Sequence, residues 1–281
     1  MTQCKIVSCN VRGIQDSVKR QDVFEYLKQL KGQIYCVQDI HCGDGDEAEF
    51  RKDWQFEALF SCGTSNSRGV ALLLNNNFEY KIKKINRDQN GNYLAVNIEM
   101  FGFDSTIICL YGPNIDNPQF YDNIKMVIED MESATIIICG DWNLVQDYAI
   151  DTKYYVRNNN PRAQRVVLDM KAQFELYDPW RTMYPNKQQY TWFQRNPIKM
   201  SRLDFFLVSS DIMALTNKVN FHPGYRSDHS IVNLQLLLNK SVRGRGFWKF
   251  NTSLLKDQTY VDLVEKQLKK ISGDTLLIIS I

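Results

Sequence analysis

The sequence predicts an α/β fold, a four-layer α/β/β/α sandwich in which two mostly antiparallel sheets pack together and helices flank them. Three observations predict this fold. Short apolar segments of strand character and longer helical segments interleave over residues 1–238. The strand segments outnumber those that a simple doubly wound fold uses. Hydrophobic residues make up 44% of the 281 residues, which is ordinary for a well-buried core.

The elements follow from apolar periodicity and from the Gly, Asn and Pro residues that bound each segment. The expected strands are 5–9, 33–38, 56–61, 69–75, 79–86, 92–100, 105–110, 134–139, 189–193, 202–208 and 230–238. The expected helices are 18–30, 118–132 and 161–173. Strands between 56 and 110 alternate or run apolar, so we expect them to be successive antiparallel strands.

The residue composition of the chain changes after Leu238, where we place a domain boundary. Residues 239–250 (NKSVRGRGFWKF) mix basic and aromatic side chains without an acid, and 258–270 have the pattern of an amphipathic, charged helix. The basic and aromatic segment suits contact with a nucleic-acid backbone, and it equally suits docking on a neighbouring domain. We therefore expect a catalytic domain at 1–238 and a linker and helix at 239–281, of which 271–281 resemble an interrupted module.

Charge and cysteine content exclude some classes of protein. The net charge of +2 neither requires nor excludes nucleic acid as a partner. The seven Cys include no CxxC pair, and several lie in apolar runs, so we expect buried free thiols in a reducing compartment. Only three His are present, which disfavours zinc. Neither a signal peptide nor an apolar run of about 20 residues is present, so the expected location is intracellular, without a membrane.

Polar residues gather at the ends of the expected strands, where a rigid scaffold meets solvent. They are Asn10, Asp39, Tyr111, Asn114, Asp141, Asn143, Asp228 and His229. Carboxylates and amides suit magnesium or manganese better than zinc. His229 is the strongest candidate for proton transfer near neutral pH. A metal ion together with a His base is a standard means of cutting a phosphodiester, which is the chemistry that these residues favour.

Each residue also has a plain structural interpretation. An Asp or Asn after a strand is usually a turn residue or a helix cap. Arg202 and Asp204 could form a simple surface ion pair, and His229 could be a structural histidine. The specific signal is the order of seven short motifs. They are NVRG (10–13), QD (38–39), LYGPN (110–114), GDWN (140–143), YTW (190–192), SRLD (201–204) and SDH (227–229).

This order of motifs resembles the endonuclease/exonuclease/phosphatase superfamily, which has the DNase I-like fold, over residues 4–238. Within it the chain is most similar to the apurinic-like endonuclease domain of non-LTR (LINE-type) retrotransposons. Arg12 stands where repair apurinic endonucleases carry an acid. The segment 190–204 is short, and GRGFWKFN at 244–251 is similar to the link toward a reverse transcriptase.

The resemblance implies a role for each motif residue. Asp39, Asn10 and Asp228 would bind Mg²⁺, for which Mn²⁺ can substitute. Asp141 and Asn143 would orient the scissile phosphate and the attacking water, and Tyr111 would donate to the phosphate. Asp204 would fix the tautomer of His229, which is either the general base or a cation that stabilises the phosphate. The substrate-binding residues would be Asn114, Thr191, Arg195 and Arg12, the first two holding the network or contacting the phosphate.

One residue departs from the superfamily pattern, because Asp39 stands where the superfamily has Glu. Its side chain is one methylene shorter, which reduces its reach by roughly 1.5 Å. Misplacement of about 1 Å can cost on the order of 100-fold in rate. Either the backbone compensates, or activity is weak, or another metal is preferred.

The function that the resemblance implies is a metal-dependent DNA endonuclease that nicks double-stranded DNA, leaving a 3′-hydroxyl and a 5′-phosphate. The 3′-hydroxyl would prime reverse transcription by a linked reverse transcriptase, and the nucleus is the expected place of action. Three alternatives remain open: a repair apurinic/apyrimidinic endonuclease, a phospholipid or inositol phosphate hydrolase, and a catalytically weakened DNA-binding module of the same fold.

Basic residues near the motifs are candidates for contact with phosphate, although most surface Lys and Arg only increase solubility. These candidates are Arg12, Arg68, Arg157, Arg162, Arg195 and Lys199. Residues 194–200 lie between two motif strands, so we expect a hairpin that overhangs the site and probes the minor groove.

Overall fold

The structure is a computed structural model that describes residues 2–43, 45–156, 158–238 and 258–272. Contacts within the chain divide it into two compact units, Met1–Lys240 and Ser241–Ile281. In the second unit the structure describes α8 (Gln258–Ser272), so the helix expected at 258–270 is confirmed. The basic and aromatic segment 239–250, Arg157 and residues 273–281 lie outside the described residues, and their expected roles stay predictions.

The described part of the first unit contains a sheet of six strands in the order β13-β14-β1-β2-β4-β3. In that order they are Thr216–His222, Ile231–Leu238, Thr2–Asn10, Ile34–Gln38, Val70–Leu74 and Ala58–Ser61. Strands β1 and β2 are parallel, with Asn10 opposite Gln38. The other neighbouring strands are antiparallel, as is usual when a hairpin or a long loop joins them.

A second sheet has five strands in the order β12-β8-β7-β6-β5. In that order they are Asp204–Val208, Ile136–Asp141, Phe103–Tyr111, Tyr93–Met100 and Tyr80–Arg87. Here β7 and β8 are the parallel pair, with Tyr111 opposite Asp141. Each sheet therefore has one parallel pair near its centre, and the carboxyl ends of these pairs carry the polar motif residues.

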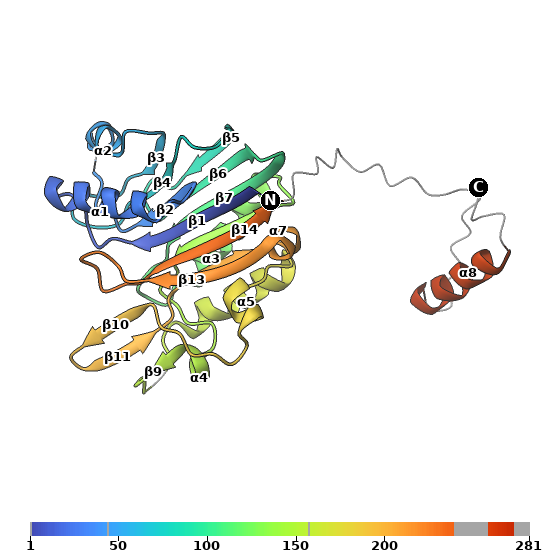
Figure 1. Ribbon diagram of the computed structural model, residues 1–281. Coiled ribbons are helices and arrows are strands. Elements are labelled where there is room, and N and C mark those ends of the chain that lie inside the picture. Colours follow the sequence, from blue (N-terminus) through green and yellow to red (C-terminus); the bar gives the residue numbers. More distant parts are fainter. Residues whose placement is uncertain (1, 44, 157, 239–257, 273–281) are drawn as a thin grey trace. The chain divides into compact units, whose positions relative to one another are not determined.

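The two sheets pack face to face, as Figure 1 shows, and enclose a core of aliphatic residues that includes Ile6, Leu72 and Ile107. Helices α1 (Ser17–Gln29) and α2 (Glu47–Trp54) cover the outer face of the first sheet. Helices α3 (Pro118–Asp130) and α5 (Pro161–Gln173) cover the outer face of the second sheet. The predicted four-layer sandwich is therefore confirmed.

The hairpin expected at 194–200 is present in a third, three-stranded sheet of order β10-β11-β9. Its strands are Trp192–Arg195, which begins later than the strand expected at 189–193, Ile198–Ser201, and Thr152–Lys153, which was not predicted. Strand β13 and helices α2, α4 (Tyr148–Asp151), α6 (Pro179–Met183) and α7 (Ser210–Leu215) were also missed. Most of these segments are shorter than the window in which apolar periodicity is informative, and β13 is an edge strand with few buried side chains.

The expectation that every Cys is a free thiol is wrong at one pair. Cys42 and Cys62 form a disulfide, with their Cα atoms 4.9 Å apart. They follow β2 and β3, which come together only because both strands flank β4, so spacing along the sequence does not reveal the pair. Within the described residues five Cys are free and buried, as expected: Cys4, Cys9, Cys36, Cys109 and Cys139. No helix in the described ranges is long and apolar enough to cross a membrane.

Candidate active site

The polar motif residues meet in one pocket at the carboxyl ends of the two parallel strand pairs. Asn10 ends β1, Asp39 follows β2, Tyr111 ends β7 and Asp141 ends β8. The pocket measures about 320 Å³. It is lined by Asn10, Arg12, Asp39, Tyr111, Asn114, Asp141, Asn143, Leu144, Val145, Tyr148, Tyr155, Asn159, Asn160, Trp192, Leu203, Asp228 and His229.

The GDWN motif places Asp141 through close packing of backbone. A Cβ atom at Gly140 would lie 1.9 Å from the carbonyl oxygen of Leu110, so only glycine allows β8 to approach β7 there. Trp142 is fully buried and stacks on Phe205 with ring centroids 4.8 Å apart. The motif is therefore fixed between two strands before any ligand binds.

His229 is buried between two carboxylates. Its Nδ1 lies 2.9 Å from Oδ2 of Asp204, and its Nε2 lies 3.6 Å from Oδ2 of Asp141. Burial lowers the pKa of His229, but the charges of Asp204 and Asp141 more than offset this and raise it to about 10. The arrangement therefore favours an imidazolium whose Nε2 faces the pocket.

Asp141 is hydrogen-bonded to two other residues of the site. Its Oδ2 accepts a hydrogen bond from Nδ2 of Asn10 at 2.9 Å, and its Oδ1 accepts from the backbone N–H of Asn143 at 3.0 Å. Burial raises its pKa, and the charge of His229 partly offsets that rise. Asn143 has a φ of +49° and donates from Nδ2 to the carbonyl oxygen of Gly112 at 2.8 Å, which fixes its side chain.

Tyr111 is a neutral phenol that lines the pocket. Burial raises its pKa, as do the charges of Asp39 and Asp141, while hydrogen bonds from Asn114 and Asn143 partly offset the rise. A neutral phenol can donate a hydrogen bond to an anionic oxygen in the pocket.

Asp39 lies at the start of a constrained loop. Its φ is +55°, and its backbone carbonyl accepts from the N–H of Gly13 at 2.7 Å. Its Oδ1 accepts from the backbone N–H of Arg68 at 3.2 Å and lies 3.2 Å from Nε2 of His41. The residues that the structure describes donate no hydrogen bond to Oδ2. One oxygen is therefore anchored, and the other remains available in the pocket.

The donor set around Asp39 fits a hard divalent cation. Asp39, Asp228 and Asn10 all line the pocket and offer only oxygen ligands. Asp228 accepts from Nε1 of Trp192 at 3.2 Å and has one oxygen 3.7 Å from Nη1 of Arg12, so it keeps further acceptor capacity. Asp141, Asp204 and His229 also lie close enough to hold a metal ion, but they already bind one another.

The arrangement is that of a known family. Residues 7–229 match the endonuclease/exonuclease/phosphatase family. The chain belongs to this family. The resemblance to LINE-type elements agrees with the presence of a transposon protein among the relatives in sequence.

Two proteins are similar to this chain in sequence, a transposon protein and an exonuclease. The chain is 24% identical over 265 residues to the Transposon TX1 uncharacterized 149 kDa protein of Xenopus laevis, covering 92% of this chain and 20% of that protein. It is 22% identical over 229 residues to the exodeoxyribonuclease of Bacillus subtilis (strain 168), covering 74% of this chain and 89% of that protein. The chain thus spans about a fifth of the transposon relative.

Solved structures of two AP endonucleases share the fold of this chain. The AP endonuclease LMAP of Leishmania major matches with a TM-score of 0.71 at 13% identity, over 84% of this chain and 88% of that one. The AP endonuclease of Archaeoglobus fulgidus matches with a TM-score of 0.68 at 18% identity, over 84% of this chain and all of that one. These likenesses establish the DNase I-like fold.

Some predicted site residues of this family member lie outside the pocket. Thr191 is fully buried, and its Oγ1 accepts from the backbone N–H groups of Leu203 and Asp204, each at 3.0 Å. It can hold the strand that carries Asp204, but it cannot contact a substrate. Asp204 lies behind His229, and Arg195 lines a neighbouring cleft.

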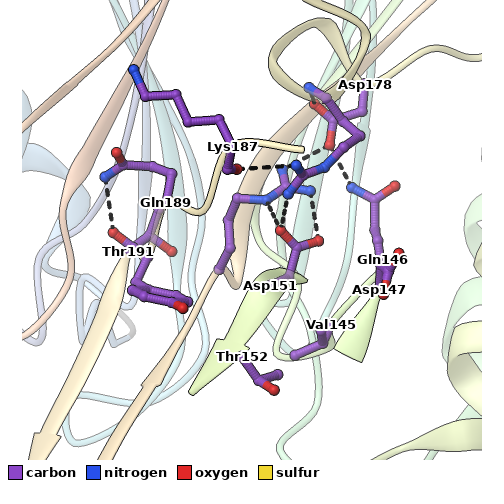
Figure 2. Close-up of polar contacts among 12 residues, drawn as sticks. Val145, Gln146, Asp147, Asp151, Thr152, Asp178, Lys187, Gln189 and Thr191 are labelled. Atoms are coloured by element: carbon purple, nitrogen blue, oxygen red, sulfur yellow. Dashed lines mark hydrogen bonds and ion pairs between the residues drawn. The ribbon is translucent and has the colours of Figure 1, made fainter. Parts of the chain in front are cut away.

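Arg202 does not form a surface ion pair with Asp204. It is buried, and its guanidinium donates to Asp151 at 2.7 and 2.9 Å and to Asp178 at 2.7 Å. Arg181 also pairs with Asp151. Figure 2 shows Asp151 and Asp178 in this cluster, with Gln146 beside Asp178. The network ties α4 and α6 to the start of β12, which begins at Asp204.

Sequence reasoning missed a set of lining residues and one supporting residue. Tyr148, Tyr155, Asn159 and Asn160 line the pocket from the segment between β8 and α5, and His41 supports Asp39 from beside the pocket. Nothing in the sequence pattern around Asn159 and Asn160 shows that these residues line the site.

Proposed function

We propose that this chain is a divalent-metal-dependent endodeoxyribonuclease that nicks double-stranded DNA. The observation that carries the proposal is one pocket that brings together two groups of residues. One group is His229 held between Asp204 and Asp141, and the other is the oxygen ligands of Asp39, Asn10 and Asp228. The family is divalent-metal-dependent, and Mg²⁺, with Mn²⁺ as a substitute, is the ion that this donor set suits.

Each residue has a task that follows from its position. The bound ion would offset the negative charge that develops on the phosphate. Asp141 and Asn143 orient the phosphate and the water that attacks it. Tyr111 donates a hydrogen bond to a phosphate oxygen. With its pKa raised to about 10, His229 acts as a cation that stabilises the anionic phosphate, and Asp204 keeps its ring in place.

Attack of water on phosphorus breaks the bond to the 3′-oxygen, which leaves a 3′-hydroxyl and a 5′-phosphate. The likeness to a transposon protein supports the further proposal that this 3′-hydroxyl primes reverse transcription by a linked module. Action on chromosomal DNA would then take place in the nucleus. Both statements concern a longer protein, of which this chain would be one part.

The test is nicking of supercoiled plasmid in Mg²⁺ and in Mn²⁺. We expect the wild type to convert plasmid to the open circle, and His229→Ala and Asp141→Ala to lose at least about 100-fold in rate. Unchanged nicking by both variants would disprove the site assignment. DNA binding without cleavage in either metal would instead favour a weakened binding module.

A repair apurinic endonuclease is the second candidate, because AP endonucleases are among the solved structures that share this fold. The two candidates differ in substrate. A nickase of the transposon type cuts intact duplex, whereas a repair enzyme strongly prefers a duplex with one abasic site. Arg12, which lines the pocket where repair enzymes carry an acid, favours the first. Comparison of the two duplexes at equal concentration decides between them.

A further inference from the structure

A second cleft opens directly beside the catalytic pocket. It measures about 710 Å³ and shares Arg12, Trp192, Asp228 and His229 with the pocket. Its other wall is formed by β10, with Phe193 and Arg195, and by the loop 223–228, with Arg226. A chain molecule bound with one group at His229 can therefore extend into this cleft, because the pocket and the cleft share that residue.

The cleft carries an excess of positive charge. Three arginines line it, namely Arg12, Arg195 and Arg226, and the one acid among its lining residues is Asp228. Asp228 is already hydrogen-bonded to Trp192. Among the described residues, no ion pair involves Arg195 or Arg226. Asp228 lies 3.7 Å from Arg12, and one acid against three arginines leaves an excess of positive charge, which favours an anionic ligand.

A fourth cation lies behind this wall. Lys19 donates from Nζ to the carbonyl oxygens of Val11 and Arg12, at 2.9 and 2.8 Å. Burial lowers the pKa of Lys19, and so do the charges of Arg226 and Arg12. The three cations therefore lie close enough for the two arginines to act on Lys19.

The loop that carries Arg226 is fixed in place before a ligand binds. Tyr225 donates to Asp22 on α1 at 3.0 Å, and Ser227 donates to the carbonyl oxygen of Asn10 at 2.8 Å. These two anchors flank Arg226, whose own φ is +49°. An exposed arginine held between two anchored neighbours loses less conformational entropy when it binds a ligand than one on a free loop.

Phe193 indicates that the ligand is more than a simple anion. This side chain is 44% exposed on the cleft wall, and its backbone N–H donates to the carbonyl oxygen of Asp228 at 3.3 Å. An exposed ring among arginines is the combination that binds a nucleic-acid strand, with contacts to phosphates and stacking on a base. The groove on the other side of the pocket has one arginine, Arg68, one acid, Asp88, and six amide side chains.

We propose that the cleft lined by Arg12, Phe193, Arg195 and Arg226 binds the phosphodiester backbone of a DNA strand on one flank of the cut position. The proposal rests on the proposed nuclease function. It implies that the DNA strand is bound more strongly on the His229 and Trp192 side of the pocket than on the other side. Arg226, which no sequence motif indicated, contributes a direct phosphate contact.

The experiment measures binding of a fluorescent 20-base-pair duplex to the full 281-residue chain in EDTA, where no cleavage occurs, across a series of salt concentrations. We expect Arg226→Ala to weaken binding about fivefold to tenfold and to reduce the salt slope by about one. Arg226→Lys keeps the charge and should recover most of the slope. Phe193→Ala should weaken binding while leaving the slope unchanged.

Lys218→Ala is the matched control, because it also removes one exposed positive charge, at a position on β13 opposite Gln235, away from the site. Its slope should equal that of the wild type. The proposal is overturned if Arg226→Ala binds with the wild-type affinity and slope, or if Lys218→Ala loses as much as Arg226→Ala. Failure of the nuclease function itself would appear separately, as absence of nicking by the wild type in metal.

Discussion

At the scale of single residues, Asp39 combines a short side chain with unusually firm support. Its Oδ1 is held by the backbone N–H of Arg68 and lies beside His41, and its backbone is bonded to Gly13. A Cβ atom at Gly13 would lie 2.6 Å from Nδ1 of His41, so the two loops fit together only with glycine there. These contacts fix the direction of the Asp39 carboxylate, but they do not extend its reach into the pocket.

Replacement of Asp39 by Glu tests whether reach limits the reaction. The added methylene extends the carboxylate into the pocket by roughly 1.5 Å, so we expect Asp39→Glu to nick plasmid about tenfold faster in Mg²⁺. Asp39→Asn has the same length without the charge and should lose activity and Mn²⁺ affinity together. A slower Asp39→Glu enzyme would mean that His41 and Arg68 already place the shorter carboxylate correctly.

At the scale of elements, the buried Arg202 network decides where the third sheet lies. Asp151 ends α4 directly before β9, Asp178 precedes α6, and Arg202 lies between β11 and β12. Removing one partner of such a network leaves a buried charge without compensation, which typically costs about 3–5 kcal/mol. Elements that are too short to be stable alone are held by these charges rather than by apolar packing.

Asp178→Asn tests this network through pH. Burial would raise the pKa of Asp178, but Arg202 more than offsets this, so its pKa in the folded protein is lowered. A lowered folded-state pKa contributes stability above the unfolded-state pKa, and that stability disappears as pH falls through the folded value. We therefore expect Asp178→Asn to be about 3 kcal/mol less stable at pH 7, with the difference shrinking below about pH 4.

Urea unfolding at a series of pH values measures this difference. The distinguishing result is that the difference in stability between the wild type and Asp178→Asn decreases at low pH. Loss of ordinary packing would instead lower the stability by the same amount at every pH. A difference that stays constant from pH 7 to pH 3 would therefore contradict the assigned charge interaction.

At the scale of the whole molecule, every residue of the pocket belongs to the first unit. The last pocket residue, His229, precedes β14, which ends at Leu238 and lies between β13 and β1 in the first sheet. We expect a chain that ends at Lys240 to keep its melting temperature within about 3 °C and to nick plasmid at an unchanged rate, because the core between the sheets stays complete. A chain that ends before β14 should not fold.

Calorimetry and the plasmid assay compare the two truncated chains with the full one. Loss of nicking in the chain that ends at Lys240, with its melting temperature preserved, would show that residues 241–281 contribute to DNA binding. Such a result would assign a direct role to the basic and aromatic segment while leaving the pocket unchanged.

The sequence by itself determined most of the fold and most of the pocket. Long apolar strands such as β6 and β14 carry their own periodic pattern, and the motifs from NVRG to SDH identify Asn10, Asp141, Asn143 and His229 without coordinates. These features are local, because a strand end and its turn lie within a few residues of each other.

Only the tertiary structure decided the features that depend on distant segments. The Cys42–Cys62 pair, the burial of Thr191 and Arg202, the support of Asp39 by His41 and the arginine cleft around Arg226 each join residues from different strands or loops. Neither hydropathy nor spacing carries that information, because a charged or hydroxyl side chain looks alike in sequence whether it meets solvent or a buried partner. Packing determines which of the two it meets.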